Sequence, residues 1–451
     1  MKEQEVMDYV EKLKKYGSHP GLSSITALCE KLGNPQEELK FIHIAGTNGK
    51  GSVTAFLTEV LKKAGYRVGR YISPTIFEYR DQIQIGTRPI SKKDLGRLME
   101  QVREVCLQLV AEGKPHPTAF EVETALGFLY FKEKHCELVV LETGMGGLLD
   151  ATNIVNHTVV SVITSISYDH MAVLGRTLPE IAAQKAGIFK QGAEAVVLKA
   201  VPEVLTVFEQ KAGELSIPLR IVDPEKCKHV RSTLSKQSFD YEGMQKIVIS
   251  MAGRYQIDNA CLAKTRRRLI LLCLAIEAIR ALIDAGYSVS EKALYEGLLG
   301  ASWPGRFQVI GKNPCFIADG AHNRDGARRL AESLRFYFTN KRILYIIGIL
   351  RDKEQDEILK NTCFLADRVL TVPTPGERGM SSYELACKVR DYQPDVTALD
   401  SVQEAVEMAY LLADKDTVIV AFGSLSYLGA LIKEAERAGK DHRNENRKPG
   451  I

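Results

Sequence analysis

The segment from Phe41 to Ser52 reads FIHIAGTNGKGS and places glycines around one lysine and one serine. Its apolar and β-branched beginning, Phe41 to Ala45, predicts a buried strand. From Lys50 to Gly65 apolar residues recur at helical spacing, so a helix is expected there. A strand that runs through a glycine loop into a helix is an arrangement that binds phosphate groups at the helix N-terminus.

Three side chains of this loop have chemistry that suits a nucleotide phosphate. Lys50 can neutralise the outer phosphates, and the hydroxyl of Ser52 or Thr47 can reach a magnesium ion. The usual GxxxxGK[ST] pattern is not met, because Gly46 precedes Lys50 by four positions and Gly51 separates the lysine from its serine. A glycine-rich turn that serves only packing is therefore the alternative at this point.

Polar residues follow two further strand-like runs, at the edge where open α/β sheets bind ligands. Glu142 follows Leu138 to Leu141, and His170 follows Val162 to Ile166. Alone, each fits a solvated carboxylate or a structural histidine. Beside a phosphate loop, both could help to hold one or two magnesium ions.

Lys185 is expected on a helix that begins with a capping box. Thr177-Leu-Pro-Glu180 supplies that box with proline in the first turn, and Gly187 is expected to end the helix. By pattern alone, Lys185 is a surface lysine.

Strand-like runs alternate with helical patterns along the chain, which is typical of α/β layers with largely parallel sheets. Asp223 to Ser250 differs, and its short alternating stretches predict an antiparallel patch. The expected strands are Phe41 to Ala45, Leu138 to Leu141, Val159 to Ile166, Ala195 to Leu198, Cys315 to Ala318, Ile343 to Ile349, Arg368 to Val372 and Val418 to Phe422.

A domain boundary is expected near Leu299 to Trp303, where one series of elements ends and another begins. The predicted division is a first domain over 1–300, a second over 301–438 and a polar, disordered tail over 439–451.

The composition is that of a soluble globular protein, with 451 residues of which 45% are hydrophobic and 26% charged. A net charge of +4 gives no support to nucleic-acid or membrane binding, so neither partner is expected. No signal peptide or bilayer-spanning run is found, which favours a cytoplasmic location. The nine cysteines contain no CxxC pair, so neither disulfides nor a zinc site are indicated.

Taken together, the motifs resemble those of the folylpolyglutamate synthase family, whose bacterial members are often also dihydrofolate synthases and which belongs to the Mur ligase superfamily. They occur in the family's order and cover roughly residues 20 to 430. The motifs are AGTNGKGS at 45–52, ISP at 72–74, PTAFEVETA at 117–125, LETGMGGLLDATN at 141–153, SISYDHMAVLGRTLPEIAAQKAGIFK at 165–190, GRYQIDNA at 253–260, WPGRF at 303–307 and DGAHNRDG at 319–326.

The resemblance implies a P-loop-type N-terminal domain with a mostly parallel sheet and a smaller Rossmann-like C-terminal domain that carries the glutamate ligase function. It also implies an activity: an acyl phosphate formed from ATP on a folate carboxylate is attacked by the amino group of L-glutamate. The folate would be a reduced folate or dihydropteroate. Magnesium, as two ions, would assist, and a monomer is expected.

The resemblance further assigns roles to residues at matching positions. Ser73 and Glu142 would ligate the first magnesium, while His170 and a carbamylated Lys185 would serve the second. The expected ATP contacts are Thr47, Asn48, Gly49, Lys50, Gly51, Ser52, Gln256, Asn259, Arg306 and Asp319.

Substrate contacts follow in the same way. His322 and Ser424 would bind the incoming glutamate, and Asp81 and Asp150 would bind the folate. The residues expected to take part in catalysis are Lys50, His170, Lys185, Asp319 and His322.

Two departures from the family pattern stand out. The family's Glu-Arg-Ile triplet on a loop over the folate is Asp81-Gln82-Ile83 here, so the acid is kept in shorter form and the arginine is absent. Residues 264–275 also look like an insertion that includes the basic run KTRRR. At about 100° per residue, an insertion of roughly twelve residues would turn the following apolar face by about 120°, so the insert is expected to loop out or break the helix. The basic run is expected in a solvated loop.

Two other functions compete with this interpretation. A cell-wall Mur ligase would share the loop and metals, but no N-terminal domain for a uridine nucleotide precedes the loop at residue 46. A non-catalytic nucleotide-binding protein would not need Glu142, His170 and Asp319 together. Whether the chain acts on dihydropteroate, on tetrahydrofolate polyglutamates or on both stays open.

Overall fold

The computed structural model describes residues 1–17, 21–233, 236–250 and 267–445. These residues divide into two compact units. Unit 1 is Met1–Lys228, Asp240–Ile249 and Arg266–Ser302, and the main segment of unit 2 is Trp303–Ile451. Among the described residues, none of the helices combines the length and apolar character needed to cross a bilayer.

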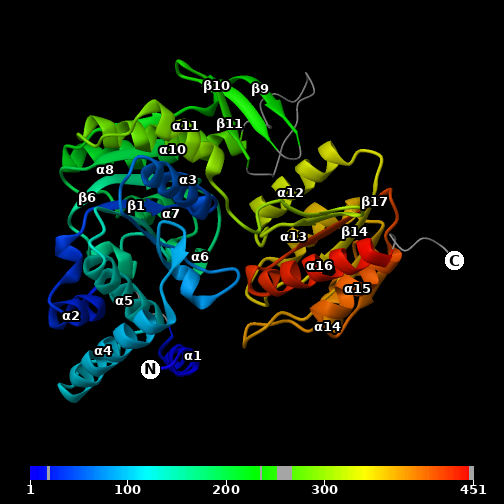
Figure 1. Ribbon diagram of the computed structural model, residues 1–451, viewed down its shortest axis with the longest axis horizontal. Helices are drawn as coiled ribbons and strands as arrows, with labels where there is room; N and C mark the ends of the chain where they lie inside the picture. The colour runs from blue at the N-terminus through cyan, green and yellow to red at the C-terminus, as the bar shows by residue number, and fades with distance from the viewer. Residues whose placement is uncertain (18–20, 234–235, 251–266, 446–451) are drawn as a thin grey trace. The chain divides into compact units, whose positions relative to one another are not determined.

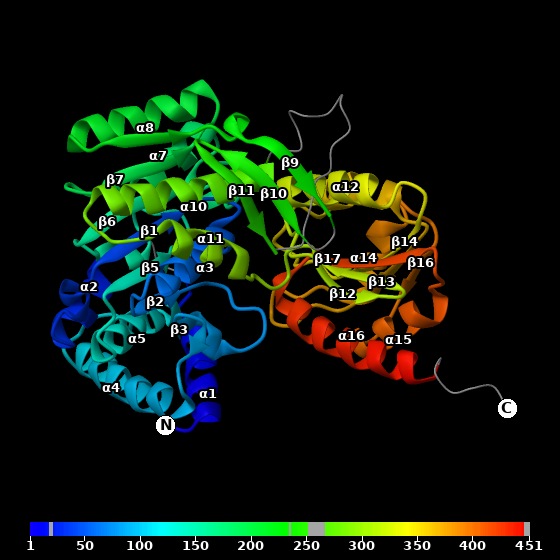
Figure 2. The same ribbon diagram turned by 45° about the horizontal axis from the view of Figure 1, so that its top comes forward.

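Unit 1 is built on an eight-stranded sheet of order β4-β3-β2-β5-β1-β6-β7-β8 (Figures 1 and 2). From β2 to β8 neighbouring strands are parallel, and β3 and β4 are antiparallel additions at one edge. The strands are β1 (Phe41–Ala45), β2 (Val68–Tyr71), β3 (Ile83–Ile85), β4 (Arg88–Pro89), β5 (Leu138–Glu142), β6 (Thr158–Ile163), β7 (Glu194–Leu198) and β8 (Leu219–Val222).

Helices cover both faces of this sheet, as parallel strands require. The face that carries Phe41 and Leu141 packs on α2 (Ser23–Lys31), α4 (Lys92–Ala111) and α5 (Ala119–Glu133). Further along the same face, Ile163 packs on α7 (Leu178–Ala186) and α8 (Pro202–Leu215). The opposite face carries α3 (Lys50–Lys63), α10 (Arg267–Asp284) and α11 (Glu291–Gly300) (Figure 1). The remaining elements of unit 1 are α1 (Glu3–Leu13), α6 (Met171–Leu174), η1 (Lys14–Tyr16), η2 (Pro35–Glu38), η3 (Tyr79–Gln82), η4 (Ala151–Ile154) and η5 (Pro224–Lys226).

A separate three-stranded sheet has the order β11-β10-β9. Its strands are β9 (Lys228–Ser232), β10 (Gln237–Tyr241) and β11 (Met244–Ile249). The two-residue turn Glu242–Gly243, with positive φ at both positions, makes β10 and β11 an antiparallel hairpin. The antiparallel patch expected between Asp223 and Ser250 is therefore present.

Unit 2 contains a six-stranded sheet of order β12-β13-β17-β14-β15-β16, in which only β12 is antiparallel to its neighbour. The strands are β12 (Gln308–Lys312), β13 (Cys315–Ala318), β14 (Arg342–Ile347), β15 (Arg368–Thr371), β16 (Val396–Ala398) and β17 (Thr417–Phe422). The helices are α12 (Arg324–Tyr337), α13 (Gln355–Thr362), α14 (Ser382–Val389), α15 (Val402–Leu412) and α16 (Leu425–Glu445), with η6 (Cys363–Leu365). The predicted α/β class, with a mostly parallel sheet flanked by helices and a smaller C-terminal α/β domain, is confirmed.

Several predicted details were wrong. The strand expected to reach Ile166 ends at Ile163, because the chain turns there to meet the glycine loop. The tail expected to be disordered from Gly439 is helical as far as Glu445, since its charged residues are good helix formers that extend α16. Strands β2, β3, β4, β8, β12 and β16 were not predicted.

The expectation that the insert at residues 264–275 loops out or breaks the helix was also wrong for its described part, residues 267–275. Helix α10 is continuous from Arg267, so the end of the basic run is helical and not in a loop. All residues from Leu272 to Ile279 are buried, so α10 is enclosed on every side. The expected rotation of about 120° matters only for a helix with a single apolar face. A helix that is buried on all sides can be rotated about its axis and still place apolar residues against the core. Residues 264–266 lie outside the described residues.

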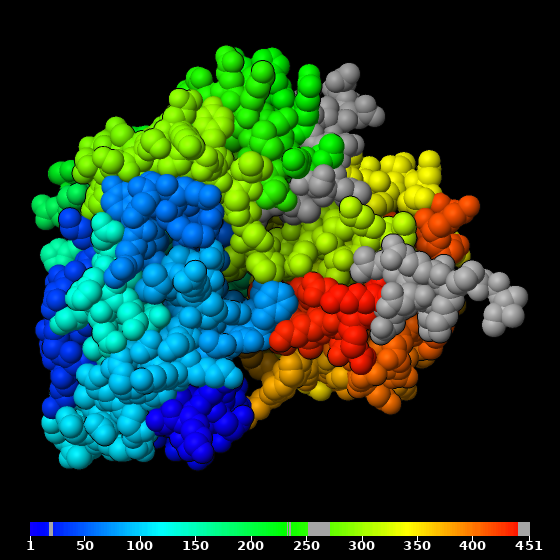
Figure 3. Space-filling model, in the orientation of Figure 1, coloured from blue at the N-terminus to red at the C-terminus, as the bar shows by residue number. Residues whose placement is uncertain are grey.

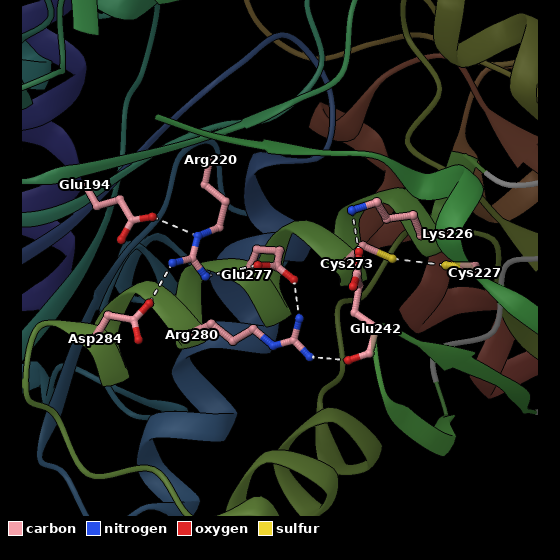
Figure 4. A network of polar contacts seen from close by, with 9 residues as sticks. All are labelled: Glu194, Arg220, Lys226, Cys227, Glu242, Cys273, Glu277, Arg280 and Asp284. Atoms are coloured by element: carbon pink, nitrogen blue, oxygen red, sulfur yellow. Dashed lines mark hydrogen bonds and ion pairs between the residues drawn. The ribbon is translucent and has the colours of Figure 1, made fainter. Parts of the chain in front are cut away.

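Arg220 on β8 ties α10 to the edge of the sheet (Figure 4). Its guanidinium donates to Glu194 at 2.8 Å, to Glu277 at 3.1 Å and to Asp284 at 2.7 Å. Arg280 continues the network from Glu277, at 2.7 Å, to the carbonyl oxygen of Glu242, at 2.8 Å. The hydrogen bond from Arg280 to Glu242 thus joins α10 to the turn of the β10–β11 hairpin.

Arg220→Ala is expected to lower the free energy of unfolding of unit 1 by about 2 kcal/mol, because it removes the cation paired with the largely buried Glu194 and leaves Glu277 with Arg280 alone. Urea unfolding followed by circular dichroism measures the change. The matched control is Arg97→Ala, whose exposed ion pairs on α4 should contribute about 0.5 kcal/mol or less. Equal losses in the two variants would contradict the prediction.

Candidate active site

The glycine loop leaves the centre of the unit 1 sheet and enters α3. Strand β1 is fully buried between β5 and β6, and the loop follows it at the carboxyl edge. Gly46 has φ +148° and Gly49 has φ +99°, conformations that side chains with a Cβ rarely adopt. A Cβ on Gly46 would overlap the Thr164 hydroxyl, and one on Gly49 would overlap Leu271 of α10. Both glycines are therefore required by the packing around the loop.

Hydrogen bonds fix this loop to the segment that follows β6. The Thr47 amide donates to the Ser165 carbonyl at 2.7 Å, and the Thr47 hydroxyl donates to the Ser167 carbonyl at 3.1 Å. The Asn48 amide donates to the Ser165 hydroxyl at 3.1 Å, which in turn donates to the Asn48 carbonyl. The loop is held in shape before any ligand binds, which reduces the entropy cost of binding.

Lys50 and Ser52 lie in the first turn of α3. The Lys50 ammonium donates to the Gly46 carbonyl at 3.2 Å, so it is folded back over the loop. Ser52 is 8% exposed, with its backbone among the first amides of the helix. The first N–H groups of a helix have no intrahelical partner, and the helix dipole favours an anion there. These residues together can hold a phosphate group.

Ser73 follows β2, and Glu142 is the last residue of the neighbouring parallel strand β5. Tyr71 pairs with Leu141 in the register, so the two side chains come from the same edge of the sheet. Glu142 is 5% exposed. Among the described residues there is no ready-made group of three or more histidine, cysteine or acidic side chains for a metal. A hydroxyl and a carboxylate nevertheless fit magnesium, which uses few protein oxygens together with waters and phosphate.

Lys185 is buried, which overturns its interpretation as a surface lysine. It lies near the end of α7, whose Thr177 cap accepts a hydrogen bond from the Glu180 amide as predicted, and it is 3% exposed. Burial, and next the positive charge of Lys50, lower the pKa of Lys185 to about 7, against the opposing effect of Asp169. A substantial fraction of the side chain is therefore an uncharged amine at neutral pH.

His170 lies at the start of α6 with φ +50°, and its imidazole is 43% exposed. Its backbone amide donates to the Asp169 carboxylate at 3.0 Å, and its Nε2 is 3.8 Å from the same carboxylate. Asp169 was not singled out in the sequence, although a carboxylate next to a histidine at a strand end is a recognisable signal. Through Asp169, the segment after β6 is linked electrostatically to Lys185.

Asp150 is buried and saturated with hydrogen-bond donors. Its carboxylate accepts from the amides of Met145, at 2.8 Å, and Thr152, at 3.1 Å, and from the Thr152 hydroxyl at 2.6 Å. His43 Nε2 lies 2.8 Å from that hydroxyl. Because burial lowers the pKa of His43 to about 3, the imidazole is neutral and donates to the hydroxyl. Asp150 thus shapes the glycine loop after β5.

Asp81 lies in the turn η3. The segment between β2 and this turn forms part of the surface shown in Figure 3. Its carboxylate accepts from the Glu78 amide at 3.1 Å, and burial raises its pKa. Arg80 anchors the same turn by donating to Glu3 at 3.0 Å and to the Ile90 carbonyl at 2.9 Å.

Two residues of unit 1 that sequence reasoning missed lie beside these groups. Arg70 is 5% exposed on β2, on the face shared with Glu142, and Glu142 and Asp81 act to raise its pKa against the dominant effect of burial, which lowers it to about 10. Glu123 on α5 contacts the η3 turn. A charged residue within an otherwise apolar strand or helix was the available signal in both cases.

Unit 2 holds the remaining predicted residues, Arg306, Asp319, His322 and Ser424. Asp319 and Ser424 follow the adjacent parallel strands β13 and β17. The Asp319 carboxylate accepts from the Phe307 amide at 2.7 Å, and a Cβ on Gly320 would overlap the Arg306 guanidinium. These four residues therefore share one edge of the unit 2 sheet, while Gln256 and Asn259 lie outside the described residues.

Comparison with known protein families gives two matches. Residues 44–265 match the Mur ligase middle domain, and residues 305–425 match the Mur ligase glutamate ligase domain.

Curated proteins and solved structures agree with these matches. The chain is 35% identical over 363 residues to a dihydrofolate synthase/folylpolyglutamate synthase of Bacillus subtilis, covering 79% of this chain and 82% of the relative. A folylpolyglutamate synthase structure from Thermotoga maritima is 32% identical with a TM-score of 0.81, covering 95% of this chain and 96% of the other. A Mycobacterium tuberculosis folylpolyglutamate synthase solved with ADP and AMPPCP is 26% identical with a TM-score of 0.84, covering 99% and 100%.

Proposed function

The chain belongs to the dihydrofolate synthase/folylpolyglutamate synthase family of Mur ligases, and from this premise we propose how its residues carry out the reaction. It is an ATP-dependent ligase that joins L-glutamate to a folate carboxylate. The observation that carries the residue assignment is the cluster of Lys50, Asp169 and the buried Lys185 beside the glycine loop.

The reaction proceeds through an acyl phosphate. An oxygen of the folate carboxylate attacks the γ-phosphorus of ATP, the bond to the β-phosphate oxygen breaks, and ADP leaves. The amine of L-glutamate then attacks the acyl carbon, loses a proton and expels inorganic phosphate. The loop from Thr47 to Ser52, with the free amides of α3 and the Lys50 ammonium, orients the phosphates and offsets their charge.

Magnesium, as two ions, would neutralise phosphate charge in this site. Ser73 and Glu142 would hold the first ion, and His170 and a carbamylated Lys185 would serve the second. The lowered pKa of Lys185 supports this assignment, since only the uncharged amine can attack carbon dioxide to form a carbamate.

The substrate assignments follow the family pattern. Asp81 and Asp150 would lie at the folate, and His322 and Ser424 at the glutamate. The ATP contacts would be completed by Gln256, Asn259, Arg306 and Asp319.

We assign the ATP-binding role to residues 1–300 and the glutamate ligase role to residues 301–438. A monomer in the cytoplasm is proposed, and for the location the support is that the eight described cysteines are free thiols, which suit a reducing compartment. The chain is proposed to extend folate polyglutamates and to convert dihydropteroate to dihydrofolate.

The decisive assay measures ADP release with L-glutamate, and with dihydropteroate or tetrahydrofolate as the acceptor. Release that requires both glutamate and a folate supports the proposal, and the two acceptors tested side by side separate one activity from both. ADP release without either would favour a nucleotide-binding switch. Release that requires a different acceptor would favour another Mur-type ligase.

His170→Ala is expected to lower kcat for ligation about a hundredfold while ATP binding changes by less than about threefold, because the imidazole would help to hold the second magnesium, whose charge matters most in the transition state, and would not bind the nucleotide itself. Isothermal titration with a non-hydrolysable ATP analogue and steady-state kinetics measure the two effects. The control is His157→Ala, an exposed histidine outside the site. Normal turnover of the His170 variant would remove this residue from the metal assignment.

A further inference from the structure

Glu123 lies in a polar cluster between α5 and the η3 turn. Its carboxylate accepts from the Gln82 amide nitrogen at 3.0 Å, and it is also hydrogen-bonded by the Tyr79 hydroxyl. The same Gln82 nitrogen donates to the Tyr71 hydroxyl at 3.0 Å, which is 3.1 Å from the Thr124 hydroxyl. The first and last residues of η3 are thus both attached to one carboxylate on α5.

These contacts determine where Asp81 lies. Asp81 is between Tyr79 and Gln82 in the four-residue turn, so a shift of either end moves its carboxylate. Arg80 fixes the opposite side of the turn through Glu3 and the Ile90 carbonyl. The contact through Glu123 joins η3 to α5, the helix that begins inside the PTAFEVETA motif.

Resting on the folate ligase function proposed above, we propose that Glu123 is a positioning residue for the folate substrate, acting through Tyr79 and Gln82 on the turn that carries Asp81. Asp81-Gln82 replaces the family's Glu-Arg pair here. A neutral Gln82 amide can donate to Glu123 and Tyr71 at once. At the position where the family carries an arginine, these two hydrogen bonds attach the turn to α5 and β2.

The ionisation of Glu123 affects the strength of the hydrogen bonds that it accepts from Gln82 and Tyr79. Burial raises the pKa of Glu123 to about 7, while hydrogen bonds from Gln82 and Tyr79 and the charge of Lys14 oppose the rise. The groups that face the carboxyl are Tyr79 from η3, Tyr71 from β2 and Lys14 from η1. Above about pH 7 the carboxylate accepts both hydrogen bonds as an ion, and below that pH the protonated carboxyl accepts them more weakly.

The test compares Glu123→Ala and Glu123→Gln with Glu133→Gln, a change at the exposed end of the same helix. Glu123→Ala should raise the KM for tetrahydrofolate about tenfold and leave the KM for ATP within about twofold. Glu123→Gln should recover part of that loss, since its carbonyl still accepts a hydrogen bond. In the wild type and Glu133→Gln, the KM for the folate should fall as the pH rises through about 7, and in Glu123→Gln this component should be absent.

The outcomes separate two failures. If all variants ligate glutamate with unchanged KM values and pH profiles, Glu123 has no positioning role and the ligase function stands. If the wild type itself does not ligate glutamate to a folate, the proposed function fails first. Equal changes in the KM for ATP and for the folate would assign Glu123 a general structural role and overturn the inference. Tyr79→Phe, which removes one donor without a charge change, should reproduce a smaller rise in the folate KM.

Discussion

Lys185→Ala is expected to lower glutamate ligation about a thousandfold, which is the loss expected when a charged group that stabilises a transferring phosphoryl group is removed. The side chain is 3% exposed and its pKa is lowered to about 7 by burial, with a further contribution from Lys50. An amine of which a substantial fraction is uncharged at neutral pH can add carbon dioxide, and the product carries a negative charge. Steady-state ADP release with tetrahydrofolate and glutamate measures the loss.

Two controls separate chemistry from folding in this prediction. Lys199→Ala removes an exposed lysine that pairs with Asp223, and it should retain full activity. Acetate, a small carboxylate that fits the space left by the shortened side chain, should partly restore Lys185→Ala and have no effect on the wild type. Intact mass measurement of the native wild type should show one added carbon dioxide. Full activity of Lys185→Ala, or an unmodified and active wild type, would contradict the carbamate assignment.

The glycine loop was predictable because its signal is local. The apolar run of β1, the glycines and the helical spacing from Lys50 are contiguous in the sequence, and each element forms where the pattern places it. Glu142 was found for the same reason, from its place at the end of the β5 run, whereas Asp319 was assigned by the resemblance and directly follows β13. Their places at the sheet edges follow from the parallel arrangement of the strands.

The surroundings of Lys185 were not predictable from pattern, because they are made by segments distant in the chain. The end of α7 packs against the backbone after β5, where a Cβ on Gly147 would meet the carbonyl oxygen of Lys185 at 2.8 Å. The charges that set its pKa come from Lys50, Asp169 and Asp150, on three other segments. The resemblance to a family supplied the role of the residue, and only the structure shows a lysine that is buried.

Burial also explains why the helix after the insert was misjudged. The sequence shows a long apolar run around Cys273, but it does not show how many sides of that run are covered. The structure buries α10 against the sheet and against α3 beside it, and it places Cys273 with its Sγ 3.2 Å from that of Cys227 (Figure 4). Glu123 was missed for a related reason, since its partners Tyr79 and Gln82 lie about forty residues earlier.

Gly46→Ala is expected to weaken binding of a non-hydrolysable ATP analogue at least a hundredfold and to lower the free energy of unfolding of unit 1 by about 3 kcal/mol. The φ of +148° is strained for any residue with a Cβ, and the added methyl group would overlap the Thr164 hydroxyl. Relief requires the loop to move away from β6. That movement breaks the bonds from Thr47 and Asn48 to Ser165 that hold the phosphate site in shape.

Gly65→Ala separates the effect of backbone strain from that of the overlap. Gly65 ends α3 with φ +96° and has nothing within 4 Å of an added Cβ, so its replacement should cost about 1 kcal/mol and leave analogue binding unchanged. In Gly46→Ala, the further replacement Thr164→Ala should recover part of the stability, because it removes the hydroxyl in the way but not the strain in φ. If Gly46→Ala and Gly65→Ala lose the same stability and both bind the analogue normally, contact with the segment after β6 does not determine the shape of the phosphate loop.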